Sequence, residues 1–348
     1  MSLDDTTINN MFTVGGLFSG VGGIELGFKQ AGFNTVWANE FDKYSSKTYR
    51  INHGDHLIED DVHLLQGKDL QPVDVLTGGF PCQAFSVAGY RKGFRDPRGN
   101  LFFEIARLIE ELDTPPKAIM LENVKGLSSH DKGKTAEVIK DTLRVLGYSV
   151  FWNILNTSEL TNVPQNRERT IIVGFRDEVG WEDSKDYEFP LASTNFDTIY
   201  PPKNKKKNRS IRDLLETDVD DKYYYGADKY MYKELKASMK NPETAYQWRR
   251  KYVRENQSNE MFTLTANMGT GGHNVPLIID DKGFRKLTPR ECFNFQGFPK
   301  SFKLPRDVAD GQLYKQAGNA VTVPLMKLIG SKIKIALESK YSTSLSRV

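Results

Sequence analysis

The sequence predicts an α/β protein with a doubly wound, mostly parallel sheet, into which a smaller, irregular and β-rich domain is inserted. Short apolar strands alternate with amphipathic helices through the first half of the chain, and glycine-rich turns follow two of the strands. The alternation stops near residue 181 and returns near residue 285. Such alternation is typical of a parallel sheet covered by helices on both faces, and 348 residues suit a large domain with a smaller one.

The apolar pattern also places the individual elements. We expect strands at residues 12–18, 35–40, 73–77, 118–121, 148–155 and 170–175. We expect helices at residues 22–30, 42–52, 100–112, 135–146 and 323–337. Asp42 is the expected N-cap of its helix, because a carboxylate there can accept hydrogen bonds from the free amides of the first turn.

Four segments follow from this pattern. Residues 11–180 form the main domain, and residues 181–284, which are polar and rich in Lys, Asn and Tyr, form the inserted domain. Residues 285–311 are a hinge and return segment. Residues 312–342 complete the main domain with a helix that packs back on it.

Composition narrows the function classes. No stretch approaches the ~18 apolar residues that a membrane helix needs, and the polar start of the chain does not look like a secretory signal. The chain has 2 cysteines and 5 histidines without metal-ligand spacing, so we expect neither a disulfide framework nor a metal site. A cytoplasmic location is the corresponding expectation.

Charge gives a weak indication of a nucleic-acid partner. The net charge is only +3, and the run 203–209 is interpreted as a solvated loop. A second run, Arg249, Arg250, Lys251 and Arg254, is interleaved with Trp248 and Tyr252. Bases mixed with aromatics suit contacts to both phosphates and nucleobases, so this run is favoured as a binding surface.

Two motifs follow strands of the main domain. Phe18–Gly23 is a glycine-rich turn at a helix start, and Glu40 ends the next strand, where a carboxylate can hold ribose hydroxyls. The spacing of the glycines in Phe18–Gly23 departs from the G-x-G-x-x-G pattern of dinucleotide-binding proteins, which argues against NAD as the ligand. The alternative is simply a tight turn. Cys82 follows Gly78–Pro81 at a strand end, so a surface nucleophile is favoured over a buried thiol.

Two further motifs carry charge. Glu122 ends the strand beside the one that leads to Cys82 and is a candidate proton donor; the alternative is a solvated turn carboxylate. Gln165–Arg169 contains Arg167 and Arg169, which would face the same side of a strand and could steer a phosphate or a pyrimidine carbonyl. The alternative there is a surface ion-pair cluster.

Taken together, these motifs resemble the bacterial C5 cytosine-specific DNA methyltransferases of restriction–modification type. The matching segments keep the family's order and cover nearly the whole chain outside the insert: 17–23, 80–86, 122–124, 165–169, 285–299 and 316–323. The resemblance implies a Rossmann-like methyltransferase fold that binds S-adenosylmethionine, without a metal, and releases S-adenosylhomocysteine. It also implies that residues 11–180 are the catalytic domain and that the insert recognises the target.

The resemblance assigns a role to each matching residue. Cys82 would be the nucleophile, Glu122 the acid beside the cytosine, and Arg167 and Arg169 would assist the base. The implied cofactor-binding residues are Phe18, Ser19, Gly20, Gly22, Gly23, Glu40, Phe41, Asp61, Val62, Pro81, Leu101, Asn319 and Val321. Asp60 and Asp61 both fit the adenine contact, and Asp61 is favoured because Val62 follows it. One departure is Gly16, where the family often has an acidic residue.

The chemistry explains why these groups are needed. Addition of a thiolate at carbon 6 of cytosine activates carbon 5 toward a methylsulfonium, an acid near N3 and an arginine near O2 stabilise the charge that forms, and the base must be flipped out of duplex DNA. The loop 86–100 could close over the DNA. The expected DNA-binding residues are Ser86, Arg98, Gln247, Arg249, Arg250, Thr263, Gly269, Gly271 and Gly272.

Two alternatives stay open from the sequence. The chain could methylate tRNA, since the motifs of such enzymes look similar, or it could be a catalytically inert DNA-binding relative. The expected partner is double-stranded DNA, without a membrane, and the expected state is a monomer in a bacterial or phage setting. The recognised sequence and the existence of a partner endonuclease stay open.

Overall fold

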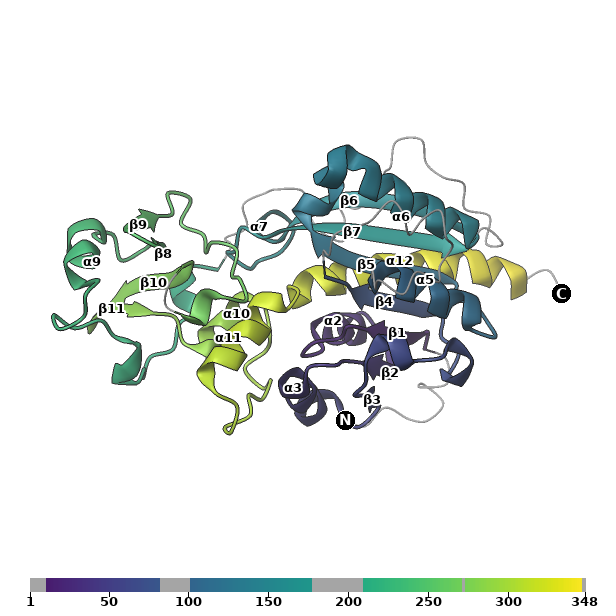
Figure 1. Ribbon diagram of the computed structural model, residues 1–348, viewed down its shortest axis with the longest axis horizontal. Helices are drawn as coiled ribbons and strands as arrows, with labels where there is room; N and C mark the ends of the chain where they lie inside the picture. Colours follow the sequence, from purple (N-terminus) through teal and green to yellow (C-terminus); the bar gives the residue numbers. More distant parts are fainter. Residues whose placement is uncertain (1–10, 82–100, 177–208, 271–272, 346–348) are drawn as a thin grey trace.

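The structure is a computed structural model that describes residues 11–81, 101–176, 209–270 and 273–345. All structural statements below refer to those residues, and side chains are described as far as residue 338. Figure 1 shows a large sheet-containing part and a smaller part beside it, with the last helix running along the large sheet.

The large sheet is mostly parallel, as expected. Its strand order is β3-β2-β1-β4-β5-β7-β6. The first five strands in this order, from β3 through β2, β1 and β4 to β5, pair in parallel. Strand β7 pairs antiparallel with both β5 and β6. The strands are β1 (Thr13–Leu17), β2 (Asn34–Asn39), β3 (Leu57–Ile58), β4 (Val75–Gly79), β5 (Ala118–Val124), β6 (Tyr148–Asn156) and β7 (Glu168–Arg176).

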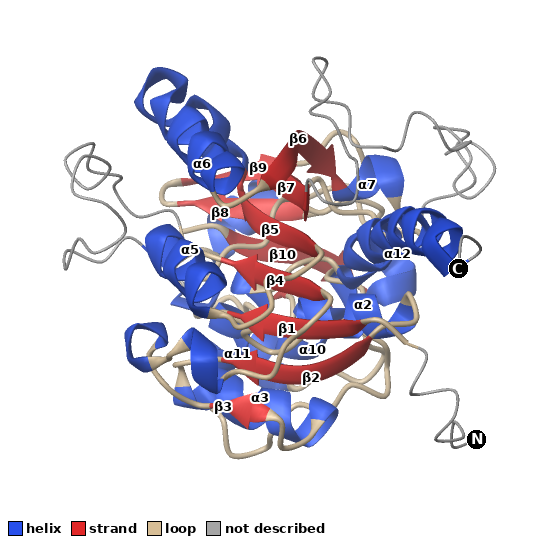
Figure 2. Ribbon diagram, turned by 90° about the vertical axis from the view of Figure 1, so that its right-hand side faces the viewer, coloured by secondary structure: helices blue, strands red, loops and turns tan. Residues whose placement is uncertain are grey.

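Helices cover both faces of this sheet. On one face lie α5 (Leu101–Glu111) and α6 (Lys134–Val145), and on the other lie α2 (Gly23–Gln30) and α12 (Val323–Leu345), as Figure 2 shows. Side chains of successive strand residues point to opposite faces of the sheet. Leu76 of β4 packs in the core on the α5–α6 face, and Val75 packs in the core on the α2–α12 face. Both cores are apolar, so each face of the sheet is buried as a parallel sheet requires.

The expected elements agree with the observed ones apart from their ends. Helix α3 (Lys43–His53) begins after Asp42, whose carboxylate accepts hydrogen bonds from the amides of Tyr44 and Ser45, so the expected N-cap is confirmed. Strand β3 has only 2 residues, too few for a sequence pattern. A short helix, α7 (Thr157–Leu160), connects β6 to β7.

The inserted part contains its own antiparallel sheet, of order β11-β10-β8-β9. Strand β11 extends to Lys286, beyond the expected end of the insert at residue 284, because Leu277 of β10 pairs with Lys286. The elements here are α9 (Tyr232–Ser238), β8 (Tyr246–Arg249), β9 (Tyr252–Glu255), β10 (Val275–Asp280) and β11 (Gly283–Lys286). After the small sheet follow α10 (Pro289–Phe295) and α11 (Asp310–Asn319).

Two apolar cores hold this part together. Trp248, Leu277 and Leu235 belong to a core between α9 and the small sheet. A second core joins α10 and α11 to residues before and after the small sheet. Among the described residues, no helix combines the length and apolar character that crossing a membrane requires.

Candidate active site

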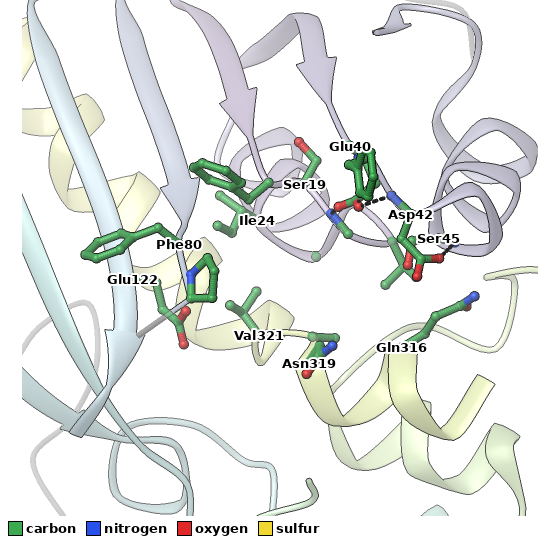
Figure 3. A pocket seen from close by; sticks show the side chains of 18 of the residues that line it. Ser19, Ile24, Glu40, Asp42, Ser45, Phe80, Glu122, Gln316, Asn319 and Val321 are labelled. Atoms are coloured by element: carbon green, nitrogen blue, oxygen red, sulfur yellow. Dashed lines mark hydrogen bonds between the residues drawn. The ribbon is translucent and has the colours of Figure 1, made fainter. Parts of the chain in front are cut away.

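A cavity of about 510 Å³ opens where β1, β2, β4 and β5 end, and α11 lies across it (Figure 3). This is the carboxyl edge of the parallel strands, where ligands of open α/β sheets bind. Of the residues expected to bind the cofactor, the following line the cavity: Phe18, Ser19, Gly20, Gly23, Glu40, Phe41, Asp61, Val62, Pro81, Leu101, Asn319 and Val321.

The glycine-rich turn links β1 to α2 with unusual backbone angles. Phe18, Gly20 and Gly22 have φ values of 55°, 58° and 84°, a region that glycine adopts readily. Gly22 does not line the cavity: a Cβ there would overlap the imidazole of His53 on α3. The glycine is therefore required by its φ and by packing against His53, and not by an approach of its backbone to a ligand.

Glu40 closes the turn from the end of β2. Its carboxylate accepts hydrogen bonds from the backbone amides of Gly20 at 2.7 Å, Phe41 at 2.9 Å and Asp42 at 2.6 Å. Burial raises the pKa of Glu40, whereas these three amides favour its charged form. The carboxylate is held in one orientation at the cavity wall, as recognition of ribose hydroxyls requires.

Asp61 and Phe41 lie toward one end of the cavity. Asp61 caps a short 3₁₀ turn and pairs with Nδ1 of His63 at 2.7 Å, and these hydrogen bonds lower the pKa of Asp61. Phe41 lines the cavity and is 71% exposed, so the surface of its ring is open to a ligand. Asp60 is absent from the cavity lining, so the position favours Asp61 over Asp60 as the ligand-facing carboxylate.

Helix α11 and the segment after it close the opposite wall. Lys315 pairs with Asp42 at 2.8 Å, and Gln316 accepts a hydrogen bond from the hydroxyl of Thr48 at 2.9 Å. Both contacts join α11 to α3. They fix the segment that carries Asn319 and Val321 against the cavity.

These residues fit an adenosine-type cofactor. The cavity combines apolar surface from Phe18, Phe41 and Leu101 with a fixed carboxylate, Glu40, and its volume is in the range of small-molecule sites. Across the described part of the chain, no cluster of three or more metal-ligating side chains occurs.

Glu122 and Arg169 lie at the other end of the cavity. Glu122 of β5 pairs with Arg169 of β7 through its Oε1 and the arginine Nε at 2.8 Å. Asn123, next along β5, donates a hydrogen bond to the carbonyl of Phe80 at 2.8 Å. The chain that leads to Cys82 is thus fastened beside Glu122. Cys82 itself lies outside the described residues.

Arg167 does not face the cavity, and the expectation that it shares a side with Arg169 is wrong. β7 begins only at Glu168, so the two-residue period of a strand does not apply to Arg167. Its side chain is 1% exposed and donates to the carbonyls of Leu264 at 2.8 Å, Gly318 at 3.0 Å and Ala320 at 2.7 Å. Desolvation lowers the pKa of this guanidinium. Arg167 therefore ties the insert to the segment around Asn319.

The small sheet carries a group of basic side chains at the β8–β9 turn. Arg249 donates to the side chains of Gln247 and Asn274, each at 3.2 Å. The charges of Arg249 and Arg250 contribute to the lowered pKa of His273, after its desolvation. Gln247 is only 5% exposed, so in this structure it orients Arg249 and does not itself reach the surface.

Two other residues expected to contact DNA have different surroundings. The hydroxyl of Thr263 donates to the carbonyl of Asn166 at 2.7 Å. A Cβ at Gly269 would come within 2.5 Å of the ring of Tyr314. The missing side chain of Gly269 thus allows packing on α11 and leaves no reason in the structure for an approach to base edges. Ser86, Arg98, Gly271 and Gly272 lie outside the described residues.

Sequence reasoning missed several cavity residues, for identifiable reasons. Ile24 follows Gly23 and Asn39 precedes Glu40, and both of these neighbours were expected to bind the cofactor. Their positions in the sequence could therefore have identified them. Gln316 begins the matching segment 316–323 but was not assigned to the cofactor. Lys315 precedes that segment and gave no such signal, because only the folded chain brings α11 to α3. The remaining cavity residues that were not expected are Val21, Asp42, Ser45, His63, Gly79, Phe80, Asn123, Val124, Gly318 and Ala320.

Known proteins resemble this chain along most of its length. The sequence model of the C-5 cytosine-specific DNA methylase family matches residues 12–335. The type II methyltransferase M.Bsp6I of Bacillus sp. (strain RFL6) is 51% identical, over 93% of this chain and 98% of its own. The type II methyltransferase M.SsoII of Shigella sonnei is 40% identical, over 95% of this chain and 82% of its own.

A solved structure has the same fold. The crystal structure of the S. pombe Dnmt2 methyltransferase superposes with a TM-score of 0.72 at 21% identity, covering 94% of this chain and 99% of that one. The identity is low, so this likeness concerns the fold. With the family match across both domains and a relative at 51% identity, the chain belongs to the C-5 cytosine-specific DNA methylase family and is a DNA cytosine-5 methyltransferase.

Proposed function

We propose that this chain transfers a methyl group from S-adenosylmethionine, bound in the 510 Å³ cavity, to carbon 5 of a cytosine flipped out of double-stranded DNA. One observation carries the proposal. The Glu122–Arg169 pair and the Glu40-closed glycine turn line the same cavity. A methyl donor and a base held at these two ends would meet inside one enclosure, as a direct transfer requires.

The cofactor end of the proposal rests on Glu40 and its surroundings. S-adenosylmethionine, when bound, supplies an electrophilic methyl group on its sulfonium. Glu40, fixed by three backbone amides, would accept hydrogen bonds from ribose hydroxyls. Phe18, Phe41 and Leu101 would exclude water from the nucleoside, while Asp61 would orient the adenine.

The base end rests on Cys82, Glu122 and Arg169. The Cys82 thiolate would attack carbon 6 of the ring, so that the ring electrons move to carbon 5 and that carbon forms the new bond to the methyl group. Glu122 would protonate N3 as charge builds up there, and Arg169 would hold Glu122 and stabilise O2. The methyl group would leave its sulfonium, so S-adenosylhomocysteine is released. Loss of the proton from carbon 5 to water, return of the N3 proton to Glu122 and departure of the Cys82 thiolate from carbon 6 would then restore the aromatic ring. Arg167 is left out of these steps because its side chain lies elsewhere.

The DNA end rests on the insert. Arg249 and Arg250 lie at the β8–β9 turn, and His273, just before β10, lies near both of them. The two arginines are cations of the kind that binds phosphates and guanine edges. We propose that this turn recognises a short, specific sequence of duplex DNA. We further propose that the enzyme acts as a monomer in the bacterial cytoplasm, beside a separate endonuclease for the same sequence.

A substrate comparison tests the proposed function. The purified chain is incubated with S-adenosylmethionine labelled in the methyl group, with duplex DNA of mixed sequence in one arm and total tRNA in the other. We expect label only in the DNA arm, recovered as 5-methylcytosine at one recurring sequence. Label in tRNA, or label on another base or ring position, would contradict the proposal.

A further inference from the structure

Beneath the glycine turn lies a carboxyl group that the proposed mechanism does not use. Glu25, in the first turn of α2, is 1% exposed. Neither of its carboxyl oxygens has a hydrogen-bond partner within the described ranges, and the same holds for the hydroxyl of Ser19. Ser19 lines the cavity, whereas Glu25 lies behind Ser19 and is not part of the lining. Glu25 can therefore act on a ligand only through its charge, from behind the cavity wall. A buried carboxyl group without partners is costly, so this one calls for a compensating group.

Gly16 provides the space that the Glu25 carboxyl group occupies. A Cβ at Gly16 would overlap Oε1 of Glu25 and would lie 2.8 Å from the hydroxyl oxygen of Ser19. Gly16 has no positive φ, so space alone, and not backbone conformation, requires glycine there. The carboxyl group and the Ser19 hydroxyl thus flank one point at the end of β1, directly below the turn.

Among the described residues, no cation is hydrogen-bonded to the Glu25 carboxyl group. Lys29, one turn further along α2, is the nearby positive charge and acts on His53. Burial, and to a smaller extent the charge of Glu40, raises the pKa of Glu25 to about 7. From α3, Tyr49 and His53 lie near the turn. Burial raises the pKa of Tyr49 and lowers that of His53 to about 4, so both are neutral at pH 7. The Ser19 hydroxyl lies close enough to Glu25 to favour the charged carboxylate, although the two groups do not reach hydrogen-bond geometry. It is itself neutral.

We propose that Glu25 is a positioning residue of the cofactor site, whose carboxylate under the Ser19 side of the turn attracts the α-ammonium group of S-adenosylmethionine. The inference rests on the proposed function. With the ribose at Glu40 and the methyl group directed toward Glu122, the amino-acid end of the ligand comes to the turn between them, beside Ser19 and Ile24 (Figure 3). The α-ammonium group of the ligand then supplies the positive charge that the Glu25 carboxylate lacks in the free protein. No covalent bond forms or breaks in this interaction.

Comparison of two ligands tests this role. Calorimetry measures the affinity of the full chain for S-adenosylhomocysteine and for 5′-methylthioadenosine, which lacks the amino-acid end. In Glu25→Gln, we expect roughly 10- to 100-fold weaker binding of S-adenosylhomocysteine, because an interaction with a charged partner is lost. Binding of methylthioadenosine should stay within about twofold. Glu59→Gln, on the exposed segment after β3, is the control for loss of one negative charge.

The outcomes separate this inference from the proposed function. Equal weakening of both ligands would show a merely structural role and overturn the inference, as would unchanged binding of both. Wild-type protein that binds neither ligand would contradict both proposals. We expect Glu25→Gln to fold, because the substitution keeps the shape of the side chain. Thermal unfolding of the variant without ligand verifies this.

Proton release gives a second reading. If the ammonium group favours the ionised carboxylate, binding of S-adenosylhomocysteine near pH 6.5 should release protons from the wild-type protein. The heat of binding then depends on the ionisation enthalpy of the buffer. Glu25→Gln should release fewer protons. Because the pKa of Glu40 is also raised by burial, the difference between wild type and variant, and not the wild-type value alone, reports on Glu25.

Moving the carboxylate gives the strictest test. Gly16→Asp alone should unfold more readily, since its side chain overlaps Glu25. In Gly16→Asp/Glu25→Ala the overlap with Glu25 is removed and a carboxylate returns near the same place. The Ser19 hydroxyl, 2.8 Å from the new Cβ, has to turn aside. We expect this double variant to bind S-adenosylhomocysteine at least roughly fivefold more tightly than Glu25→Ala. Affinity no better than that of Glu25→Ala would overturn the inference.

Discussion

At the residue scale, the two arginines of the Gln165–Arg169 motif have separate tasks. Arg169 pairs with Glu122 at the cavity, whereas Arg167 is buried against three carbonyls, two of which flank Asn319. The sequence alone predicted one shared task, because a strand period was assumed to include Arg167. The strand begins one residue later, and no local pattern marks that start.

This separation predicts different defects for the two positions. Arg167→Met should lower the free energy of unfolding by about 2–4 kcal/mol, because three buried carbonyls lose their donors. Arg169→Ala should lower kcat by about 100-fold, because Glu122 and the base lose a charged donor, and should leave the unfolding midpoint nearly unchanged. Urea unfolding and steady-state kinetics of both variants give the comparison. The same defect in both would contradict the separation.

Glu25 and His53, both buried beside the glycine-rich turn, make the free energy of unfolding depend on pH in opposite directions. Glu25, with its pKa raised from 4.5 to about 7, takes up a proton on folding, so its contribution is full below pH 4.5 and is lost as the pH rises toward 7. His53, with its pKa lowered from 6.5 to about 4, contributes stability above pH 6.5 that is lost as the pH falls toward 4.

Replacement of Glu25 should therefore change the pH profile in a defined direction. Glu25→Gln, without ligand, should be more stable than wild type at pH 8, where the wild-type carboxylate is charged and buried. It should also lose stability more steeply from pH 6.5 to 4.5, since only the His53 effect remains there. Thermal melting across this range measures both. A parallel shift of the whole profile would contradict the assignment.

At the element scale, the strands and helices of the large sheet could be predicted because each carries a clear period. The insert could not be resolved in this way. Strands β8 and β9 have 4 residues each, too few to show an alternation. Helix α10 did have a local signal, the Thr288–Glu291 capping box with Pro289. That signal was missed because the segment was interpreted as a hinge.

The β8–β9 turn is the element expected to read DNA. Arg249→Ala and Arg250→Ala should each relax the sequence choice, since an arginine on guanine contributes about 1–3 kcal/mol of discrimination, or weaken binding uniformly with a shallower salt dependence. Filter binding at several salt concentrations and sequencing of methylated sites distinguish the two.

The matched control for this element is Arg144→Ala. Arg144 lies on α6 and pairs with Asp141 at 3.2 Å, so the variant loses the same charge on a helix of the large domain, away from the β8–β9 turn. Wild-type rates at unchanged sites in both turn variants would place the reading surface elsewhere.

At the scale of the whole molecule, the cavity unites groups that lie far apart in the sequence. Glu40, Glu122 and Asn319 come from three separate segments, and the doubly wound topology brings the first two to one edge of the sheet. The sequence predicted that edge correctly. It gave no indication that α11 closes the cavity through Lys315 and Asp42, because such a contact depends on how the returning segment packs.

The central claim is that a cysteine attacks the flipped base inside this enclosure. Duplex DNA with 5-fluorocytosine at the target, together with S-adenosylmethionine, tests it most directly, because fluorine cannot leave carbon 5 as a cation and the adduct persists. We predict a covalent protein–DNA complex in wild type and in Cys292→Ala, whose thiol is buried with a raised pKa. We predict none in Cys82→Ala, which should still bind DNA. A complex in Cys82→Ala, or a base mapped to Cys292, would contradict the account.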